Sequence, residues 1–235
     1  MRFDVVTIFP ELFDRFKTVG LLGKAVDRGL VDIEVHELRD FSTDPHRKVD
    51  DAPYGGGPGM VMSAEPMFAA VDSIRRRSPG PVALLSPQGR SLDAAWAAEL
   101  AGHPSLILLC GRYEGVDERV REHVCDLEIS IGDFVLLGGE VAAMVVIEVL
   151  CRFIPGVVGD PESVHLDSFS NGGLTWPQYT RPVEFRGWRV PEVLLSGNHE
   201  AVAAWRRDRA EQRTLSRRPD LARHRMTFGG PTDEP

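Results

Sequence analysis

The chain has 235 residues, 43% of them apolar, and contains 3 cysteines, Cys110, Cys125 and Cys151. That length allows one large core, or a large core with a smaller second one. The cysteines have neither the paired spacing of a zinc site nor the number needed for a disulfide framework, so both classes are excluded and a reducing compartment such as the cytoplasm is expected.

Charge is distributed unevenly along the chain. The formal net charge is −8, which argues superficially against a nucleic-acid partner. Residues 181–225, however, hold 11 arginines and 6 acidic residues, whereas residues 1–180 hold 16 basic and 27 acidic ones. The arginine-rich segment is compatible with RNA binding, and equally with an ordinary solvated helix.

Neither a signal peptide nor a membrane span is expected. The start, MRFDVVTIFPELF, has one arginine, and Asp4 interrupts its apolar stretch. The most apolar predicted helix, residues 141–154, carries Glu148 and Arg152 and is too short to span a bilayer. We therefore predict a soluble, cytoplasmic protein without a membrane partner.

Apolar runs and helical patterns alternate through the first two thirds of the chain. Short runs rich in β-branched residues or leucine predict strands at residues 3–8, 31–38, 82–85, 106–110 and 127–131. Patterns with helical spacing lie between several of them, at residues 64–77, 92–101, 116–123 and 140–154. This alternation predicts an α/β fold with a mainly parallel sheet, right-handed crossovers and helices on both faces.

The pattern changes after residue 154. Residues 155–173 are rich in Gly, Pro, Ser and Asp without a period, which is typical of a mobile linker. Residues 199–213 and 216–224 look helical and basic, and the terminal GGPTDEP is expected to fray. We predict an α/β domain of residues 1–159, a flexible linker of residues 160–174 and a small, basic helical domain of residues 175–235.

The familiar phosphate-binding glycine motifs are missing. GLLGKAV, from Gly20, resembles the end of a phosphate loop, but Thr18 and Ala25 replace the residues that such a loop requires. A helix is the better interpretation. No G-x-G-x-x-G follows a predicted strand, so a dinucleotide-binding unit is not supported.

Three glycine-containing loops follow predicted strands instead: SPQGR from Ser86, CGRYEGVDERV from Cys110 and IGDFVLLGG from Ile131. Loops at the carboxyl ends of parallel strands form the ligand crevice of open α/β sheets. Glycines let main chain approach a ligand closely, and free backbone groups can bind an adenine edge. The loops therefore favour a neutral adenosine ligand. A further segment, DDAPYGGGPGMVM from Asp50, is either a surface connection or a binding loop.

The order of several motifs resembles that of bacterial tRNA (guanine-N1)-methyltransferases. These motifs are PYGGGPGM, SPQG, CGRYEGVDERV, EISIGDFVLLGGE, RFIPGVVG, DSF, YTRP, VLLSGNH and RRPDL, and they extend to about Leu221. The family belongs to the SPOUT class of S-adenosylmethionine-dependent enzymes. The resemblance implies a deep trefoil knot, a homodimer, and methylation of N1 of guanosine 37 in tRNA, with the basic terminal domain binding the tRNA.

The resemblance also implies which residues bind the methyl donor. By match to the family pattern they are Gly111, Ile131, Gly132, Asp133, Phe134, Val135 and Leu136, with Pro87, Tyr113, Glu114, Gly138 and Gly139 adjoining. Phe134 stands where the family pattern leads us to expect a tyrosine. The missing hydroxyl removes a side-chain hydrogen bond but leaves the main-chain ones.

The resemblance assigns the general base to Asp167 and the group beside guanine O6 to Arg152, with magnesium as a further expected cofactor at an unspecified site. N1 must lose a weakly acidic proton while negative charge spreads to O6, so a base and a cation are both needed. An ordinary aspartate, with a pKa of about 3.9, is a weak base, and burial would raise its pKa. Alternatively, Arg152 pairs with Glu148 and Asp167 caps a helix.

Two other functions stay open from the sequence. One is a SPOUT enzyme that methylates a ribose 2′-hydroxyl, which mapping of the modified atom would distinguish. The other is an inert RNA-binding module, which would require a disabled donor pocket; a titration with S-adenosylmethionine distinguishes it.

Overall fold

The computed structural model describes residues 1–221. The chain divides into two compact units, one of Met1–Gly159 and one that begins at Asp160. Within the described residues, every helix is too short or too polar to cross a membrane.

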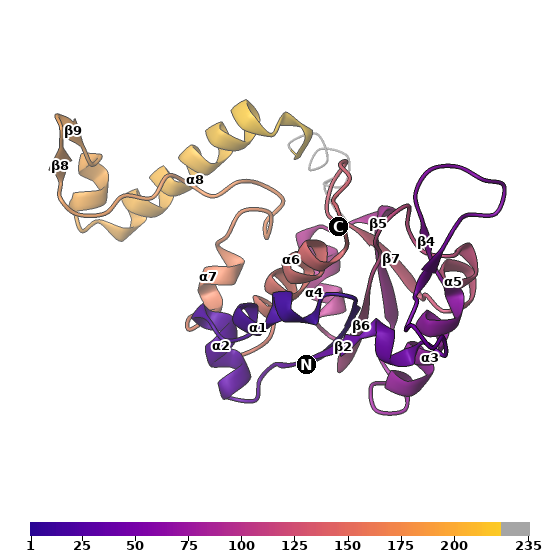
Figure 1. Cartoon of the computed structure of the whole chain (residues 1–235). Helices are drawn as coiled ribbons and strands as arrows, with labels where there is room; N and C mark the ends of the chain where they lie inside the picture. Colours follow the sequence, from indigo (N-terminus) through magenta and orange to yellow (C-terminus); the bar gives the residue numbers. More distant parts are fainter. Residues whose placement is uncertain (222–235) are drawn as a thin grey trace, which may run out of the picture. The chain divides into compact units, whose positions relative to one another are not determined.

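The first unit is built on a parallel sheet (Figure 1). Its strands are β1 (Arg2–Thr7), β2 (Asp32–Glu37), β5 (Val82–Ser91), β6 (Ser105–Cys110) and β7 (Leu127–Ser130). Their order is β2-β1-β6-β5-β7, and every neighbouring pair is parallel. The predicted mainly parallel sheet is confirmed.

β5 is longer than its sequence predicts. The register with β7 shifts between Leu85 and Arg90, so the residues between them bulge while the strand continues to Ser91. Gly89 permits this, because a Cβ there would lie 2.4 Å from the carbonyl carbon of Glu128. The SPQGR segment expected after a strand is therefore an irregular part of β5 itself.

Helices and two short strands complete the first unit. They are η1 (Pro10–Leu12), α1 (Phe13–Phe16), α2 (Gly20–Asp27), η2 (Leu38–Phe41), β3 (Asp50–Asp51), β4 (Val61–Met62), α3 (Ala64–Arg75), α4 (Ala94–Leu100), α5 (Glu118–His123) and α6 (Glu140–Cys151). The predicted helices are present with slightly shorter bounds, and the segment resembling a phosphate loop is the helix α2. α4 and α5 begin where Asp93 and Asp117 accept hydrogen bonds from backbone N–H groups of the first turn.

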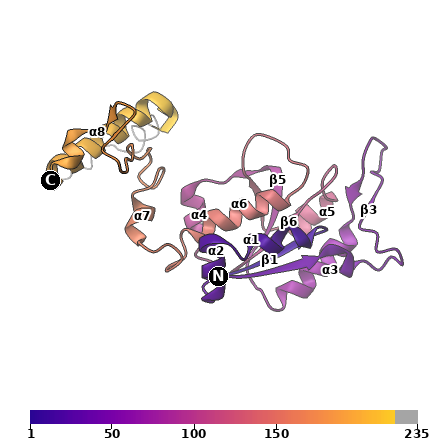
Figure 2. The ribbon, with the colours of Figure 1, turned by 60° about the vertical axis from the view of Figure 1, so that its left-hand side comes forward.

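The sheet is buried on both faces. Along β1, Phe3 and Val5 belong to one apolar cluster, whereas Val6 belongs to the other. α4 and α6 cover the first face, and α3 and α5 cover the second (Figure 2). All residues of β6 are buried, which explains why its sequence, SLILLC, is almost continuously apolar rather than alternating.

The second unit contains α7 (Pro161–His165), β8 (Glu184–Phe185), β9 (Trp188–Arg189), η3 (Glu192–Leu195) and α8 (His199–Arg217). α7 lies in the segment predicted as a linker, where Asp160 caps it by accepting from the Glu162 N–H at 2.9 Å. The helix predicted at residues 199–213 is confirmed and extends to Arg217. Residues 219–221 are helical again; the rest of the helix predicted at residues 216–224, and the terminal GGPTDEP, lie outside the described residues.

Candidate active site

The loops that follow β6 and β7 meet the bulged part of β5 around one hollow. All residues predicted to bind or adjoin the methyl donor line this hollow except Asp133, which is exposed outside it. Sequence reasoning missed other lining residues, among them Leu85, Gln88, Val116, Ile129 and Ala142. All but Gln88 contribute apolar surface, from the strand ends, the loop after β6 and α6, at the position where open α/β sheets bind ligands.

Two glycines bring the loop after β7 into direct contact with the loop after β6. A Cβ on Gly138 would lie 2.1 Å from Arg112 Nε, and one on Gly139 would lie 2.8 Å from Cys110 Cα. The Gly139 N–H donates to the Gly111 carbonyl at 2.8 Å. Only glycine fits this approach, so the run LLGG holds two backbones together rather than cradling a phosphate.

Gly132 turns the same loop back on itself. Its φ is +150°, and a Cβ there would lie 2.4 Å from Phe134 Cε1. The Ser130 hydroxyl accepts from the Gly132 N–H at 3.2 Å and lies 3.1 Å from its carbonyl. The half-exposed Phe134 ring consequently packs against Gly132 at the edge of the hollow.

A buried ion pair joins the two loops, and sequence reasoning did not identify it. Glu140 is 1% exposed, and its Oε2 accepts from Arg112 Nε at 2.9 Å. Its Oε1 accepts from the Thr7 hydroxyl at 2.8 Å. The Arg112 guanidinium also lies 4.5 Å from the centre of the Phe9 ring. The available signal was a charged residue at the first position of α6, whose sequence is otherwise apolar except for Glu148.

The glycine-rich segment from Asp50 ends against the loop after β6. The Glu114 N–H donates to the Met60 carbonyl at 3.0 Å, and a Cβ on Gly59 would lie 2.6 Å from Glu114 Oε1. Burial and the nearby Asp50 carboxylate raise the pKa of Tyr113. Between β3 and β4 the segment extends away from the sheet (Figure 1). Its base therefore supports the CGRYEG loop beside the hollow.

The cysteines are not reactive groups. Burial raises the pKa of Cys110 well above its usual value, and raises the pKa of Cys125 and of Cys151 to about 12. Each thiol stays protonated near neutral pH, so none provides a thiolate nucleophile.

Arg152 and Asp167 belong to different units. Arg152 is exposed directly after α6. Asp167 is exposed two residues after the end of α7, and lines a hollow of the second unit together with Leu174, Trp176 and Arg207. Asp160, not Asp167, caps α7, so the helix-capping alternative for Asp167 is not supported at this helix.

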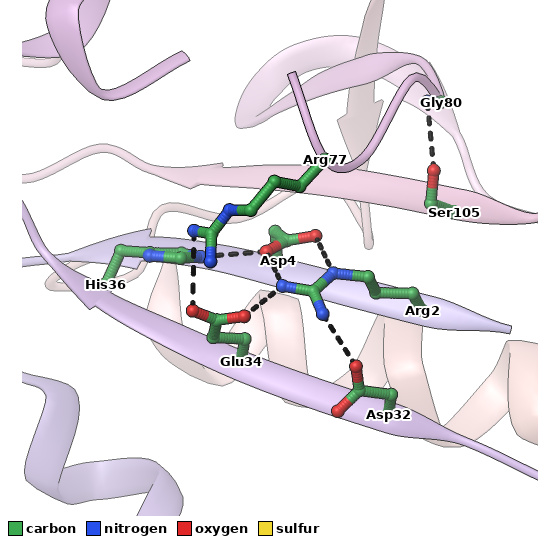
Figure 3. A network of polar contacts seen from close by, with 8 residues as sticks. All are labelled: Arg2, Asp4, Asp32, Glu34, His36, Arg77, Gly80 and Ser105. Carbon is green, nitrogen blue, oxygen red and sulfur yellow. Dashed lines mark hydrogen bonds and ion pairs between the residues drawn. The ribbon is translucent and has the colours of Figure 1, made fainter. Parts of the chain in front are cut away.

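A polar network joins neighbouring residues of β1 and β2 (Figure 3). Asp4 is fully buried; its carboxylate accepts from Arg2 Nε at 2.8 Å and lies 2.8 Å from His36 Nε2. Burial alone would raise the pKa of Asp4, but the hydrogen bonds from His36 and Arg2 outweigh it and lower that pKa to about 2. Arg2 also pairs with Asp32 and Glu34.

Asp4, Glu34 and His36 form the one group among the described residues whose ligand atoms are close enough to share a metal ion. Arg2 already supplies a positive charge there, and the strand register places Asp4 beside Ile107, far back from the carboxyl end of β6. This group does not fit a magnesium ion that assists chemistry at the hollow.

The fold and the hollow define an open, parallel α/β protein with a hollow at the carboxyl ends of its strands. Comparisons with known proteins are more specific. Residues 1–224 match the family model described as tRNA (Guanine-1)-methyltransferase TrmD. The chain therefore belongs to the tRNA (guanine-1)-methyltransferase family.

Individual relatives agree with the family model. The chain is 56% identical over 222 residues to the tRNA (guanine-N(1)-)-methyltransferase of Geobacter sulfurreducens, covering 94% of this chain and 91% of the relative. It is 55% identical over 223 residues to the protein of that name from Dehalococcoides mccartyi strain 195, covering 94% and 90%. A relative with the same name from Synechococcus sp. JA-3-3Ab is 53% identical over 221 residues, covering 94% and 87%.

Proposed function

We propose that this protein transfers a methyl group from S-adenosylmethionine to N1 of guanosine 37 in tRNA. The observation that carries the proposal is the hollow that the loops after β6 and β7 form with the bulged part of β5, in a chain of this family. The relatives are named for methylation of guanine N1 in tRNA, which favours this reaction over ribose methylation and over an inert RNA-binding module.

The residues around the hollow fit S-adenosylmethionine. Backbone of Gly111, Gly132 and Gly138 is accessible at its wall and can bind an adenine edge, while Leu85 and Ile129 provide apolar surface. Its lining carries three carboxylates and two guanidinium groups, so the net negative charge suits a donor with a net positive charge. These groups belong to Glu114, Glu118, Glu128, Arg112 and Arg121. When bound, S-adenosylmethionine supplies an electrophilic methyl group on sulfur.

Asp167 is proposed to accept the proton from guanine N1. As the new N1–carbon bond forms and the sulfur–carbon bond breaks, the N1–H electron pair must be released, so the base has to lie within hydrogen-bond reach of N1. Asp167 is exposed in the second unit, so an arriving tRNA can contact it directly. Desolvation by the bound substrate would raise the pKa of the carboxyl group and make it a stronger base.

Arg152 is proposed to stabilise the negative charge that spreads to guanine O6. Its position after α6 leaves it exposed at the end of the first unit. A guanidinium donates two parallel hydrogen bonds and keeps its charge at every relevant pH, which suits a developing oxyanion. Magnesium stays an expectation from the family resemblance, and no step is assigned to it.

We further propose that the loops around the hollow belong to a trefoil knot and that two subunits associate through α6. Val141 and Val145 are 55% and 37% exposed on this helix, and Leu137 in the preceding loop is 93% exposed. A continuous apolar surface of this kind is unfavourable in water and is typical of a symmetric subunit interface. Sedimentation of a stable monomer at micromolar concentration would contradict the dimer.

Calorimetry with S-adenosylmethionine tests the donor site. Gly138→Ala adds a methyl group where the Arg112 side chain lies, so we expect donor affinity to fall at least tenfold. Gly159→Ala is the matched control, because a Cβ there meets nothing within 4 Å. Wild-type protein that does not bind the donor, or a Gly138→Ala variant that binds it normally, would overturn this assignment of the hollow.

A further inference from the structure

The β8–β9 hairpin has one face of exposed aromatic residues. Phe185 and Trp188 are paired across the hairpin, which places both side chains on the same face. They are 57% and 73% exposed. Glu184 and Arg189 pair on the opposite face, where their charged groups lie 3.6 Å apart. The hairpin thus separates an ionic face from an aromatic one.

The turn of this hairpin and one further hydrogen bond support its antiparallel pairing. Arg186 and Gly187 both have positive φ, of 54° and 83°, which matches the twist of a two-residue turn between antiparallel strands. The Val190 N–H donates to the Val183 carbonyl at 2.9 Å and extends the ladder by one pair. The Arg186 guanidinium lies 5.2 Å from the centre of the Phe185 ring.

The aromatic face continues into a hollow of the second unit. By strand alternation Val183 and Val190 lie on the same side as the two rings, and both line this hollow. Tyr179, which is half-exposed, and Arg181 line it as well. Its remaining wall includes Trp176 and Arg206. The Arg206 guanidinium lies 4.9 Å from the centre of the Trp176 ring. Aromatic rings and arginines therefore lie together around this hollow.

We infer that this surface binds unpaired nucleotides of the tRNA substrate, with bases stacked on Trp188 and Phe185 and phosphates near Arg181 and Arg186. Single-stranded nucleic acid is bound by this combination, since every base has a face that can stack and every nucleotide carries a negative charge. Residues 181–189 contain three arginines and a single acidic residue, Glu184, so their net positive charge is complementary to RNA. The inference rests on the proposed function, because it takes tRNA as the substrate.

The test uses the full-length chain and two probes, the tRNA transcript and a ten-nucleotide oligouridylate. Stacking contributes about 1–3 kcal/mol per base, so Trp188→Ala should weaken binding to both probes roughly 5- to 150-fold. Trp188→Phe keeps an aromatic face and should stay within about threefold of wild type. Leu215→Ala is the control, since Leu215 is a similarly exposed apolar residue on α8 and should have no effect.

Salt dependence distinguishes stacking from charge. Trp188→Ala removes no charge, so the slope of log affinity against log salt concentration should not change, whereas Arg186→Ala should reduce the slope by about 1. Normal RNA binding by Trp188→Ala would overturn the inference, and so would an equal loss in Leu215→Ala. Loss of the dimer by Trp188→Ala with intact oligouridylate binding would also overturn it, because the face would then be a subunit interface.

Methyl transfer by the wild-type chain is measured in parallel. Transfer to tRNA together with normal RNA binding by Trp188→Ala would leave the proposed function standing and remove only this inference. Conversely, oligouridylate binding that depends on Trp188, in a chain that transfers no methyl group, would support the aromatic site and contradict the proposed function.

Discussion

The two units differ in how much of their structure is supported by a core. In the first unit every residue of β6 is buried, and apolar clusters cover both faces of the sheet. In the second, α8 runs from His199 to Arg217 and buries only Thr214. Large apolar side chains such as Phe185, Trp188 and Leu215 remain more than half exposed there. The first unit is stabilised by its buried apolar core, whereas the second unit exposes large apolar side chains that a partner can contact.

This difference suggests that the first unit binds the methyl donor and the second unit binds the RNA. The proposed donor pocket is made of closely approaching backbones, which the Arg112–Glu140 ion pair and the glycine contacts of the first unit hold in place. The proposed RNA-binding surface consists of exposed, charged and aromatic groups, which the second unit carries. We therefore expect substitutions in the second unit to alter RNA binding and catalysis without altering donor affinity.

Replacement of the proposed base should have the largest effect. Asp167→Asn cannot accept the N1 proton, so single-turnover methyl transfer should fall about 10²- to 10⁴-fold. Donor affinity measured by calorimetry should stay within about threefold, or roughly 0.7 kcal/mol, because no residue of the first unit changes. Asp160→Asn is the matched control, since asparagine caps α7 as well as aspartate does. Substantial turnover by Asp167→Asn would mean that another group is the base.

Truncation of a leucine should lower stability much more in the core of the first unit than on the surface of the second. Leu108 is fully buried in β6, so Leu108→Ala should cost about 2–5 kcal/mol of unfolding free energy. At roughly 2–4 °C per kcal/mol, the thermal midpoint of the first unit should fall by several degrees. Leu215→Ala removes the same atoms from an exposed site and should change the midpoint little. Equal effects of the two variants would contradict the comparison.

The first unit should also lose stability in acid through Asp4. Its pKa is about 2 in the folded protein against 3.8 as the ordinary value, so the stabilisation is complete above about pH 5 and is lost as the pH falls through 4 toward 2. The loss should amount to roughly 2 kcal/mol. Urea midpoints measured at several pH values should show a shallower acid dependence for Asp4→Asn than for wild type. An unchanged dependence would assign the acid sensitivity to other groups; Asp14→Asn, at an exposed position, serves as the control.

Arginines at the end of α8 should give the smallest effect. Replacing Arg217 and Arg218 with alanine should weaken tRNA binding and reduce the salt slope by up to about 2, while donor affinity stays intact. The reduction can be smaller, because Arg218 already pairs with Asp220 at 2.6 Å. An unchanged slope would mean that neither arginine contacts the tRNA and that both are ordinary solvated residues. Arg15→Ala together with Lys17→Ala removes the same charge from the first unit and should leave the slope unchanged.

The sequence was informative where a single segment determines its own structure. The buried strands were recognisable because parallel strands covered on both faces need apolar residues at nearly every position, as in SLILLC. The glycines of the loop after β7 also indicated a close backbone approach. The loop at Gly111 was expected at the same edge of the sheet because it also follows a predicted strand, but its direct contact with Gly139 was not predicted.

Features that depend on distant partners were not predictable. Arg112 and Glu140 are 28 residues apart, and nothing in either segment indicates that they pair. The continuation of β5 beyond Leu85 depends on the contact of Gly89 with β7. The β8–β9 hairpin was missed because its turn is Arg-Gly rather than the usual Asn-Gly, and because each of its strands has only two residues.

Methyl transfer to defined tRNA transcripts tests the central claim most directly. The protein is incubated with S-adenosylmethionine and a transcript that carries guanosine 37, or with one in which adenosine replaces it, and the modified nucleoside is identified by mass spectrometry. The account predicts 1-methylguanosine at position 37 of the first transcript and no methylation of the second. Equal methylation of both transcripts, or a methyl group on a ribose 2′-oxygen, would contradict it.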